Sequence, residues 1–296
     1  MEKLQALLAI NQNYLIAGLL LLLYVLEQTL NTPFRFRKRP QHLLNNVLFQ
    51  ITFMVAGYFF ALYQVTTIEW LNHHRVGWLH VLHLPFWIRM MVGVALFDLT
   101  TYWVHRLAHR SPLLWRLHRV HHSDTTMDAS TFFRGHPLEI LVFGNGNIVA
   151  AAVFGLDMLS LGLYALVLIP FMLAEHMNLA FPTWLDKTLG RVFVTPNFHK
   201  VHHEQDQYYT DSNFADIFIV WDRLFGTFKY KPVQDIRYGL IEFAEEKKQG
   251  FLYLMKCPFI TIPRISSEEP HQAARPGETR VVFQEPQPET KEADHR

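Results

Sequence analysis

The chain has 296 residues, of which 50% are apolar, 14% are aromatic and only 18% are charged. That charged fraction is well below the roughly 25% typical of soluble globular proteins. A net charge of +1 gives no reason to expect nucleic acid as a partner. The single cysteine, Cys257, excludes an intrachain disulfide, a cysteine-held zinc site and an iron–sulfur cluster held by this chain alone.

Apolar residues are concentrated in blocks that approach the length needed to cross a bilayer, which is about 20 residues for a helix. They occupy residues 14–31, 44–66, 82–103 and the two halves of 137–175, which are separated by Phe154-Gly155-Leu156-Asp157. The segment 44–66 has no charged residue, so a buried helix of a soluble protein explains it poorly. We therefore expect an all-α, polytopic membrane protein with about four to five transmembrane helices, the last two forming a hairpin.

The basic residues predict which way the chain crosses the membrane. The first apolar block is followed directly by Arg35, Arg37, Lys38 and Arg39, whereas the loop 68–80 has Arg75 alone against Glu69. The positive-inside rule then places 32–43, 104–136 and the residues after 176 in the cytoplasm. Ten of the seventeen histidines lie between His105 and His203, in or at the ends of these last two segments. We expect a multi-pass protein of the cell inner membrane or endoplasmic reticulum, with a cytoplasmic helical cap that holds them.

The first histidine cluster follows the third apolar block. His105 and His109 share one face if the helix continues into this segment, and Asp98 and Tyr102 fall on the same stripe. A metal-bound imidazole usually donates its other N–H to a carboxylate or a carbonyl. Asp98 is therefore the predicted partner of a ligand imidazole, and Tyr102 is a candidate site residue. Packing of Asp98 against a neighbouring helix is the alternative.

Two further clusters share the form H-x2-H-H. They are His118-Arg119-Val120-His121-His122 and His199-Lys200-Val201-His202-His203. Each follows a helix-start signal, a hydroxyl residue and then proline, in Ser111-Pro112 and Thr195-Pro196. Positions i, i+3 and i+4 bring three imidazoles to one helical face. One such cluster would fit surface histidines equally well, but two of them together with H-x3-H favour a metal site.

The eight clustered histidines exceed what one ion usually binds, so two metal ions are the natural interpretation. His176 and His136 lie where the hairpin 137–175 meets the cytoplasmic surface and are additional candidates, of which His176 is the stronger. We predict no ligand role for the histidines of the opposite face, His73, His74, His80 and His83. No role is assigned to His42, His271 and His295.

Imidazole binds zinc, copper, iron and nickel, and zinc has no redox chemistry. An oxidative function therefore requires iron or a similar redox metal. A membrane zinc hydrolase is one alternative, although the H-E-x-x-H motif is absent. A metal transporter is another, but it would place ligands near the bilayer midplane, and only Asp98 lies within an apolar block.

The spacing of the clusters and of the residues around them resembles the fatty acid hydroxylase/sterol desaturase superfamily over residues 90–230. The matching motifs are Asp98-x3-Tyr102-Trp103-x-His105-Arg106-x2-His109, His118-x2-His121-His122-Ser123, Thr195-Pro196-x2-His199-x2-His202-His203, Asn213-Phe214 and Trp221-Asp222-Arg223-Leu224-Phe225-Gly226-Thr227. The resemblance carries a metal-ligand role to His105, His109, His118, His121, His122, His199, His202 and His203, with His176 as an intermediate ligand. His136 lies in a stretch that is also similar to the family.

The resemblance implies a centre of two Fe ions, with zinc possible by substitution, that uses O2 to hydroxylate or desaturate a C–H bond. The implied substrate is a sterol, a fatty acyl chain or a related lipid taken from the bilayer. No flavin, haem or nicotinamide motif is apparent, so we expect a separate electron donor of the ferredoxin or cytochrome b5 type. We expect N-terminal membrane spans in 1–90, the catalytic domain in 91–230, a C-terminal cap segment in 231–263 and a disordered tail in 264–296.

Overall fold

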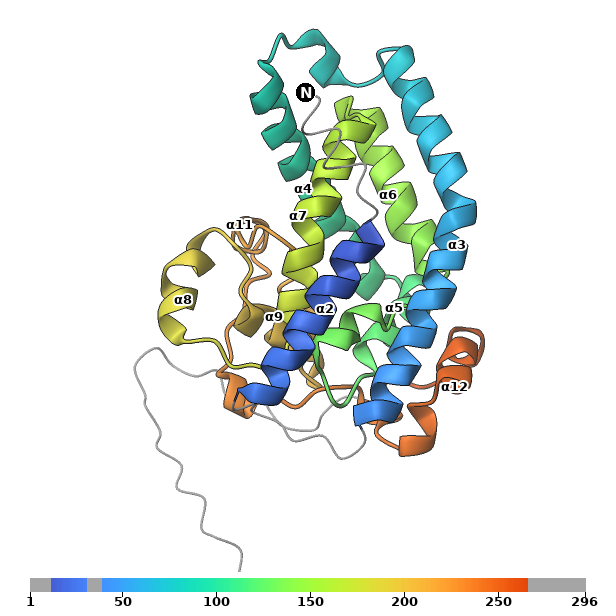
Figure 1. Ribbon diagram of the computed structural model, residues 1–296, viewed down its shortest axis with the longest axis vertical. Helices are drawn as coiled ribbons and strands as arrows, with labels where there is room; N and C mark the ends of the chain where they lie inside the picture. Colours follow the sequence, from blue (N-terminus) through green and yellow to red (C-terminus); the bar gives the residue numbers. More distant parts are fainter. Residues whose placement is uncertain (1–11, 31–38, 266–296) are drawn as a thin grey trace, which may run out of the picture.

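Helices form almost all of the regular structure in residues 12–30 and 39–265, which are the parts of the chain that the computed structural model describes. Four long helices make a bundle along the long axis of the molecule (Figure 1): α3 (Arg39–His73), α4 (Phe86–Arg110), α6 (Glu139–Phe154) and α7 (Met158–His176). Helix α2 (Gln12–Thr29) packs against α7. For the described residues the all-α prediction is confirmed, with one isolated β-bridge between Glu204 and Tyr238.

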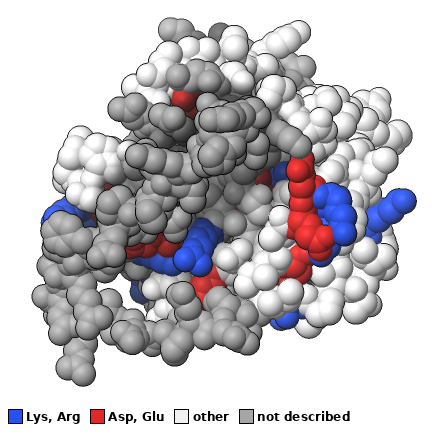
Figure 2. Space-filling view, turned by 90° about the horizontal axis from the view of Figure 1, so that it is seen from below, with Lys and Arg blue, Asp and Glu red and all other residues white. Residues whose placement is uncertain are grey.

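The shorter helices surround the lower half of the bundle in Figure 1. They are α5 (Pro112–His122), α8 (Thr183–Lys187), α9 (Pro196–His202), α10 (Gln207–Thr210), α11 (Val220–Leu224) and α12 (Phe251–Lys256). Single 3-10 turns join them at η2 (Ala129–Phe133), η3 (Leu189–Arg191), η4 (Val233–Asp235), η5 (Ile241–Phe243), η6 (Glu246–Lys248) and η7 (Cys257–Phe259). Seen from below, this end carries both acidic and basic side chains among uncharged ones (Figure 2).

As predicted, 137–175 forms two helices joined by a short turn, which lies at the upper end of the bundle, and both helices pack against α4. Gly155 ends α6 in the left-handed region, with φ of 77°, and Asp157 begins α7 with a capping box that includes Ser160. The turn packs against Gly77, which precedes η1 (Trp78–Val81) in the α3–α4 connection. A Cβ atom at position 77 would lie 2.1 Å from the Gly155 nitrogen. The α3–α4 connection and the α6–α7 turn can therefore pack together only because residue 77 is a glycine.

Both predicted helix starts at the lower end are confirmed. The Ser111 hydroxyl accepts a hydrogen bond from the Leu114 N–H at the start of α5. The Thr195 hydroxyl accepts one from the Phe198 N–H at the start of α9. Proline follows each cap, where its missing N–H costs nothing and its fixed φ suits the first helical turn. These caps determine where the two H-x2-H-H motifs sit on their helices.

Two helical stretches are long and apolar enough to cross a membrane, Pro40–Val81 and Met158–His176. Only 17% and 28% of their most apolar windows are buried, so most of that surface faces outward, unlike the core helix of a soluble protein. The segments Ile16–Glu27 and Glu139–Phe154 are apolar but shorter. Membrane contact is therefore supported by the structure, while the count of four to five spans stays a prediction.

The N-terminal helices pack directly against the helices that carry the histidines. Helices α2 and α3 both contact α7, which ends at His176, and α3 also contacts α6 and α12. Glu27 of α2 is 2% exposed, and its Oε1 accepts hydrogen bonds from the Ala129 N–H at 3.0 Å and the Asn178 N–H at 2.9 Å. The buried carboxylate thus connects α2 to the lower end of the bundle. Of the predicted tail 264–296, only Arg264 and Ile265 lie within the described residues.

The bundle predicts where reporter fusions should be found. Fusions after Arg110 and after Lys229 should report the same side of the membrane, because both residues lie at the histidine-rich end. A fusion after His74, beyond the other end of α3, should report the opposite side. Alkaline phosphatase and green fluorescent protein fusions would measure this, and opposite sides for Arg110 and Lys229 would contradict the hairpin.

Candidate metal centre

Nine buried histidines form two groups inside the lower half of the bundle. The first group is His105, His109, His118, His122 and His202; the second is His121, His176, His199 and His203. Within each group, one ring nitrogen of every histidine lies within 4.8 Å of the corresponding atoms of the others. The structure therefore brings together the eight histidines of the three sequence clusters and His176.

Each H-x2-H-H motif is divided between the two groups. In α5, His118 and His122 belong to the first group and His121 to the second. In α9 the pattern is reversed, because His199 and His203 belong to the second group and His202 to the first. The two groups are neighbours, since the rings of His122 and His203 stack with centroids 4.6 Å apart.

Most of the rings are oriented by an acceptor at their outer nitrogen. In the first group, His105 Nδ1 lies 2.9 Å from the Phe214 carbonyl oxygen and His202 Nδ1 lies 2.7 Å from that of Ser212. In the second group, His176 Nδ1 lies 2.6 Å from the Met172 carbonyl oxygen. A carbonyl can only accept, so these Nδ1 atoms carry the proton and each Nε2 presents a lone pair.

The inward nitrogens are too close for neutral rings alone. His105 and His118 both direct Nδ1 at an acceptor, yet their Nε2 atoms are 3.0 Å apart. In the second group, His176 Nε2 is 3.1 Å from the Nε2 atoms of both His121 and His199. The facing lone pairs of His105 and His118 repel at this separation unless a cation lies between them. Metal–nitrogen bonds of about 2.1 Å at right angles would place two nitrogens about 3.0 Å apart, so the donor set fits a bound metal ion in each group.

Burial keeps these imidazoles in the form that binds metal. Removal from water, together with the neighbouring histidines, lowers the pKa of His121, His122 and His203 well below the usual value. Burial likewise lowers the pKa of His202 to about 3. A metal ligand must be unprotonated, so rings that stay neutral across physiological pH need lose no proton before binding an ion.

Several carboxylates beside the rings were not identified from the sequence, and three of them lie within 3.6 Å of an Nδ1 atom. Glu139 Oε1 accepts from His118 Nδ1 at 2.8 Å, and Asp211 Oδ1 accepts from His109 Nδ1 at 3.2 Å. A Glu175 oxygen lies 3.6 Å from His199 Nδ1. Carboxylates in this position orient a metal-bound imidazole and make it more basic. Glu139 and Glu175 could have been found from the sequence, because they are close to the candidate ligands His136 and His176. No local pattern distinguishes Asp211 from other aspartates.

The prediction that Asp98 orients a ligand imidazole directly is wrong. Its two oxygens accept hydrogen bonds from the backbone N–H groups of Ile217 (3.1 Å) and Phe218 (3.0 Å) and from the Trp221 indole N–H (2.9 Å). Asp98 therefore acts on the loop before α11, which supplies the Phe214 carbonyl to His105. Its influence on the histidines is indirect, because its hydrogen bonds go to the loop.

Tyr102, the other candidate site residue of this helix, is also directed at this loop. Its hydroxyl lies 2.9 Å from the Thr227 hydroxyl and accepts from Arg106 at 3.1 Å. Thr227 in turn donates to Asp222, which also accepts from the Phe214 N–H at 2.8 Å. Tyr102 and Asp98 therefore anchor the same loop, and none of these hydrogen bonds goes to an imidazole.

His136 lies outside both groups, and the structure does not bring it to the site. Its Nδ1 accepts from the Leu138 N–H at 3.2 Å, and its Nε2 is 3.3 Å from the Met255 carbonyl oxygen. Both ring nitrogens of His136 are thus directed at backbone groups and not at either histidine group. Among the described residues, neither group contains His73, His74, His80 or His83.

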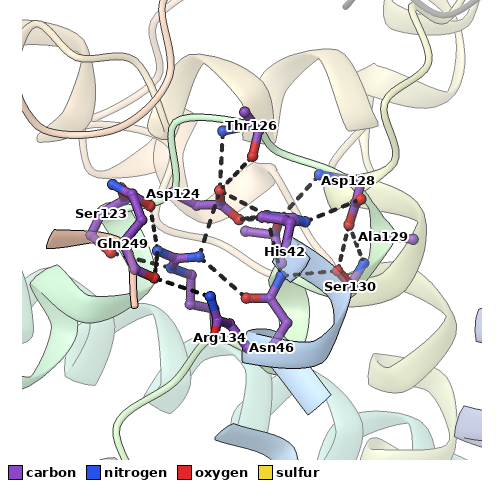
Figure 3. Close-up of polar contacts among 12 residues, drawn as sticks. His42, Asn46, Ser123, Asp124, Thr126, Asp128, Ala129, Ser130, Arg134 and Gln249 are labelled. Carbon is purple, nitrogen blue, oxygen red and sulfur yellow. Dashed lines mark hydrogen bonds and ion pairs between the residues drawn. The ribbon is translucent and has the colours of Figure 1, made fainter. Parts of the chain in front are cut away.

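A buried polar network holds the second histidine motif against α3 (Figure 3). Asp124 follows His121 and His122 and is 1% exposed. It pairs with His42 Nε2 at 2.8 Å, accepts from the Thr131 hydroxyl at 2.7 Å and lies 3.8 Å from Arg134 Nη1. Burial alone would raise the pKa of Asp124, but the nearby His42 and Arg134 hold it below its usual value. His42, to which the sequence assigned no role, therefore belongs to the frame of the site.

Residues 90–227 match the fatty acid hydroxylase family, and they contain all nine grouped histidines. The matched segment contains the motifs on which the resemblance in the sequence rests. The chain is similar to alkylglycerol monooxygenase from Danio rerio, at 34% identity over 54% of this chain and 35% of the relative. Similarity to alkylglycerol monooxygenase from Homo sapiens is 31%, over 52% of this chain and 33% of the relative.

Very-long-chain aldehyde decarbonylase GL1-8 from Oryza sativa subsp. indica is 28% identical over 62% of this chain and 67% of the relative. The chain therefore spans about two thirds of this decarbonylase, but only about a third of the length of the two monooxygenases. No solved structure matches this chain.

Proposed function

We propose that this protein is a membrane-bound, O2-dependent di-iron enzyme that hydroxylates a C–H bond of a lipid. The observation that carries the proposal is the pair of adjacent, buried imidazole groups, whose inward nitrogens converge at distances that fit bound cations. The match of residues 90–227 to the fatty acid hydroxylase family supports oxidative chemistry over hydrolysis or transport. Iron is the redox metal we propose for both groups, because imidazole binds it and zinc would not support oxidation.

Two irons bound here would supply the oxidising power, drawn from O2, that removes hydrogen from an unactivated C–H bond. The residues of the chain perform the remaining tasks. Glu139, Asp211 and the Phe214 carbonyl fix the orientation and tautomer of three rings. Burial of all nine rings excludes bulk water, which would otherwise quench a reactive oxidant.

The substrate we propose is a lipid with a long alkyl chain. The names of the relatives, alkylglycerol monooxygenase and very-long-chain aldehyde decarbonylase, support an alkyl ether lipid or a long-chain aldehyde. The surface beside the site is suited to lipid, because Trp103 and Leu107 of α4 are 46% and 55% exposed next to the buried His105. We propose that this end faces the cytoplasm and that a separate ferredoxin or cytochrome b5 type protein supplies electrons.

The test combines metal analysis with isotope labelling. The purified protein should contain about two iron ions per chain, one for each group of imidazoles. With an electron donor and 18O2, it should convert an alkylglycerol or a long-chain aldehyde to a product carrying one labelled oxygen atom. Desaturation would give an unlabelled alkene instead. An active preparation that contains zinc alone, or a product formed equally well without O2, would contradict the proposal.

A further inference from the structure

A basic pocket lies beside the first histidine group and shares His109 with it. Its volume is about 300 Å³, and it is lined by His109, Trp115, Arg110, Arg116, Arg119 and Arg264, together with Pro112, Thr261 and Ile262. Four arginines thus line the cavity, and no carboxylate of residues 12–30 and 39–265 is among its lining residues. The volume is at the small end of the range of about 300–1,000 Å³ typical of ligand pockets, which suits a head group better than a whole lipid.

Arg119 is the strongest sign that the pocket is built for an anion. It is 3% exposed, and its guanidinium donates to the carbonyl oxygens of Cys257, Ile260 and Ile262. Its Nε has no hydrogen-bond partner among the described residues. A buried cation is costly unless an opposite charge compensates it, and carbonyl oxygens carry no net charge. An anion in the pocket would supply that charge.

The neighbouring arginines leave the pocket positively charged. Arg116 donates to the Ile260 carbonyl oxygen at 3.2 Å, which is again a neutral partner. Arg264 lies over the Trp115 ring at 4.2 Å and is 3.7 Å from Asp211 Oδ1. Asp211 also accepts from His109, so its charge is shared. Glu242 is the other carboxylate that acts on Arg264, and it does not line the pocket.

The rim indicates where the anion comes from. Leu113 follows the lining residue Pro112 and is 71% exposed, and Phe259 and Ile260, which precede the lining residue Thr261, are 68% and 42% exposed. Exposed apolar side chains around a basic cavity fit the boundary between head groups and acyl chains. Arginine is also the residue best shaped to bind phosphate with two parallel hydrogen bonds. We propose that this pocket binds the phosphate of an anionic lipid head group, whichever reaction the metal centre performs.

The experiment measures binding by the purified full-length protein in a neutral detergent. Short-chain phosphatidate, phosphatidylcholine and diacylglycerol are compared by native mass spectrometry and by the shift in melting temperature. Phosphatidate should bind most tightly, and the double variant Arg116→Gln/Arg264→Gln should weaken it by about tenfold or more, because charge-assisted hydrogen bonds are lost. The matched control Arg191→Gln, an exposed arginine in η3, should bind as the unmodified protein does. Metal content should be unchanged in both, which separates this result from failure of the metal centre.

Several outcomes would overturn the proposal. Equal binding of phosphatidate by the double variant and the unmodified protein would exclude the pocket as the site. Equal binding of phosphatidylcholine would show that a net anionic head group is not required. If glycerol 3-phosphate or inorganic phosphate bound as tightly as phosphatidate, the site would belong to a soluble anion. Tighter binding of poly-glutamate than of phosphatidate would assign the pocket to an acidic protein.

Discussion

Replacing His202 or His203 with alanine should remove a different metal ion in each case, although the two residues are adjacent. His202 belongs to the group of five imidazoles and His203 to the group of four. Each variant should fall from about two ions per chain to about one, and activity should fall by more than the 10–100-fold typical of losing an outer partner of a ligand. The group of four has no spare ring, so the ion should be lost more readily from His203→Ala than from His202→Ala during chelator challenge.

Metal per chain after chelator dialysis, turnover and melting temperature measured on the same samples would check this result. His73→Ala is the matched control, because His73 is exposed at the other end of α3 and should change none of the three quantities. The variants His121→Ala and His122→Ala should give the same contrast in α5. His121→Ala should lose the ion of the group of four, and His122→Ala the ion of the group of five. Full metal content and turnover in either His202→Ala or His203→Ala would refute the division of the motifs between two ions.

Asp124→Asn should destabilise the protein strongly by breaking the buried network beside the second histidine motif. Asp124 and Arg134 are each 1% exposed, and removing one partner of a buried charge pair costs about 3–5 kcal/mol, because the other charge is left uncompensated. The aspartate also accepts from Thr131 and the Thr126 N–H, bonds that an amide can replace only in part. Unfolding followed by tryptophan fluorescence in one fixed detergent would measure the loss.

Two further variants make this prediction specific. Glu245→Gln removes an exposed carboxylate that pairs with Lys247 and Lys248, and it should leave the stability unchanged within error, since exposed ion pairs contribute little. Asp124→Asn/Arg134→Gln removes both charges and should be less destabilised than the two single variants added together. A melting temperature for Asp124→Asn equal to that of the unmodified protein would show that the network does not stabilise the fold.

The sequence by itself determined the helical class, the positions of the helix starts and the identity of the grouped histidines. Ser111-Pro112 and Thr195-Pro196 act through local backbone geometry, so their effect could be predicted without knowing what α5 and α9 contact. The break at 154–157 is equally local, because Gly155 ends one helix and Asp157 begins the next. Histidine spacing identified the cluster residues, because few other functions need so many imidazoles at helical intervals.

Only the tertiary structure decided how those imidazoles are shared. An α-helix turns about 100° per residue, so His118 and His122 are about 40° apart around α5, while His121 and His122 are about 100° apart. Both angles fit a single broad face, and the facing helix determines whether that face serves one ion or two. Here α9 supplies His202 to one group and His203 to the other.

The partners of the polar residues were likewise decided by packing between distant segments. Asp98 accepts a hydrogen bond from the N–H of Ile217, which lies 119 residues further along the chain. No local pattern could show whether the Asp98 carboxylate contacts this loop or an imidazole. His109 and Asp211 are 102 residues apart, so the carboxylate that orients this ring was not visible in the sequence. His136 and His176 both flank the hairpin 137–175, but only His176 lies where α7 meets α9. Helical periodicity determines which side chains share a face, and the packing of helices distant in sequence determines what that face contacts.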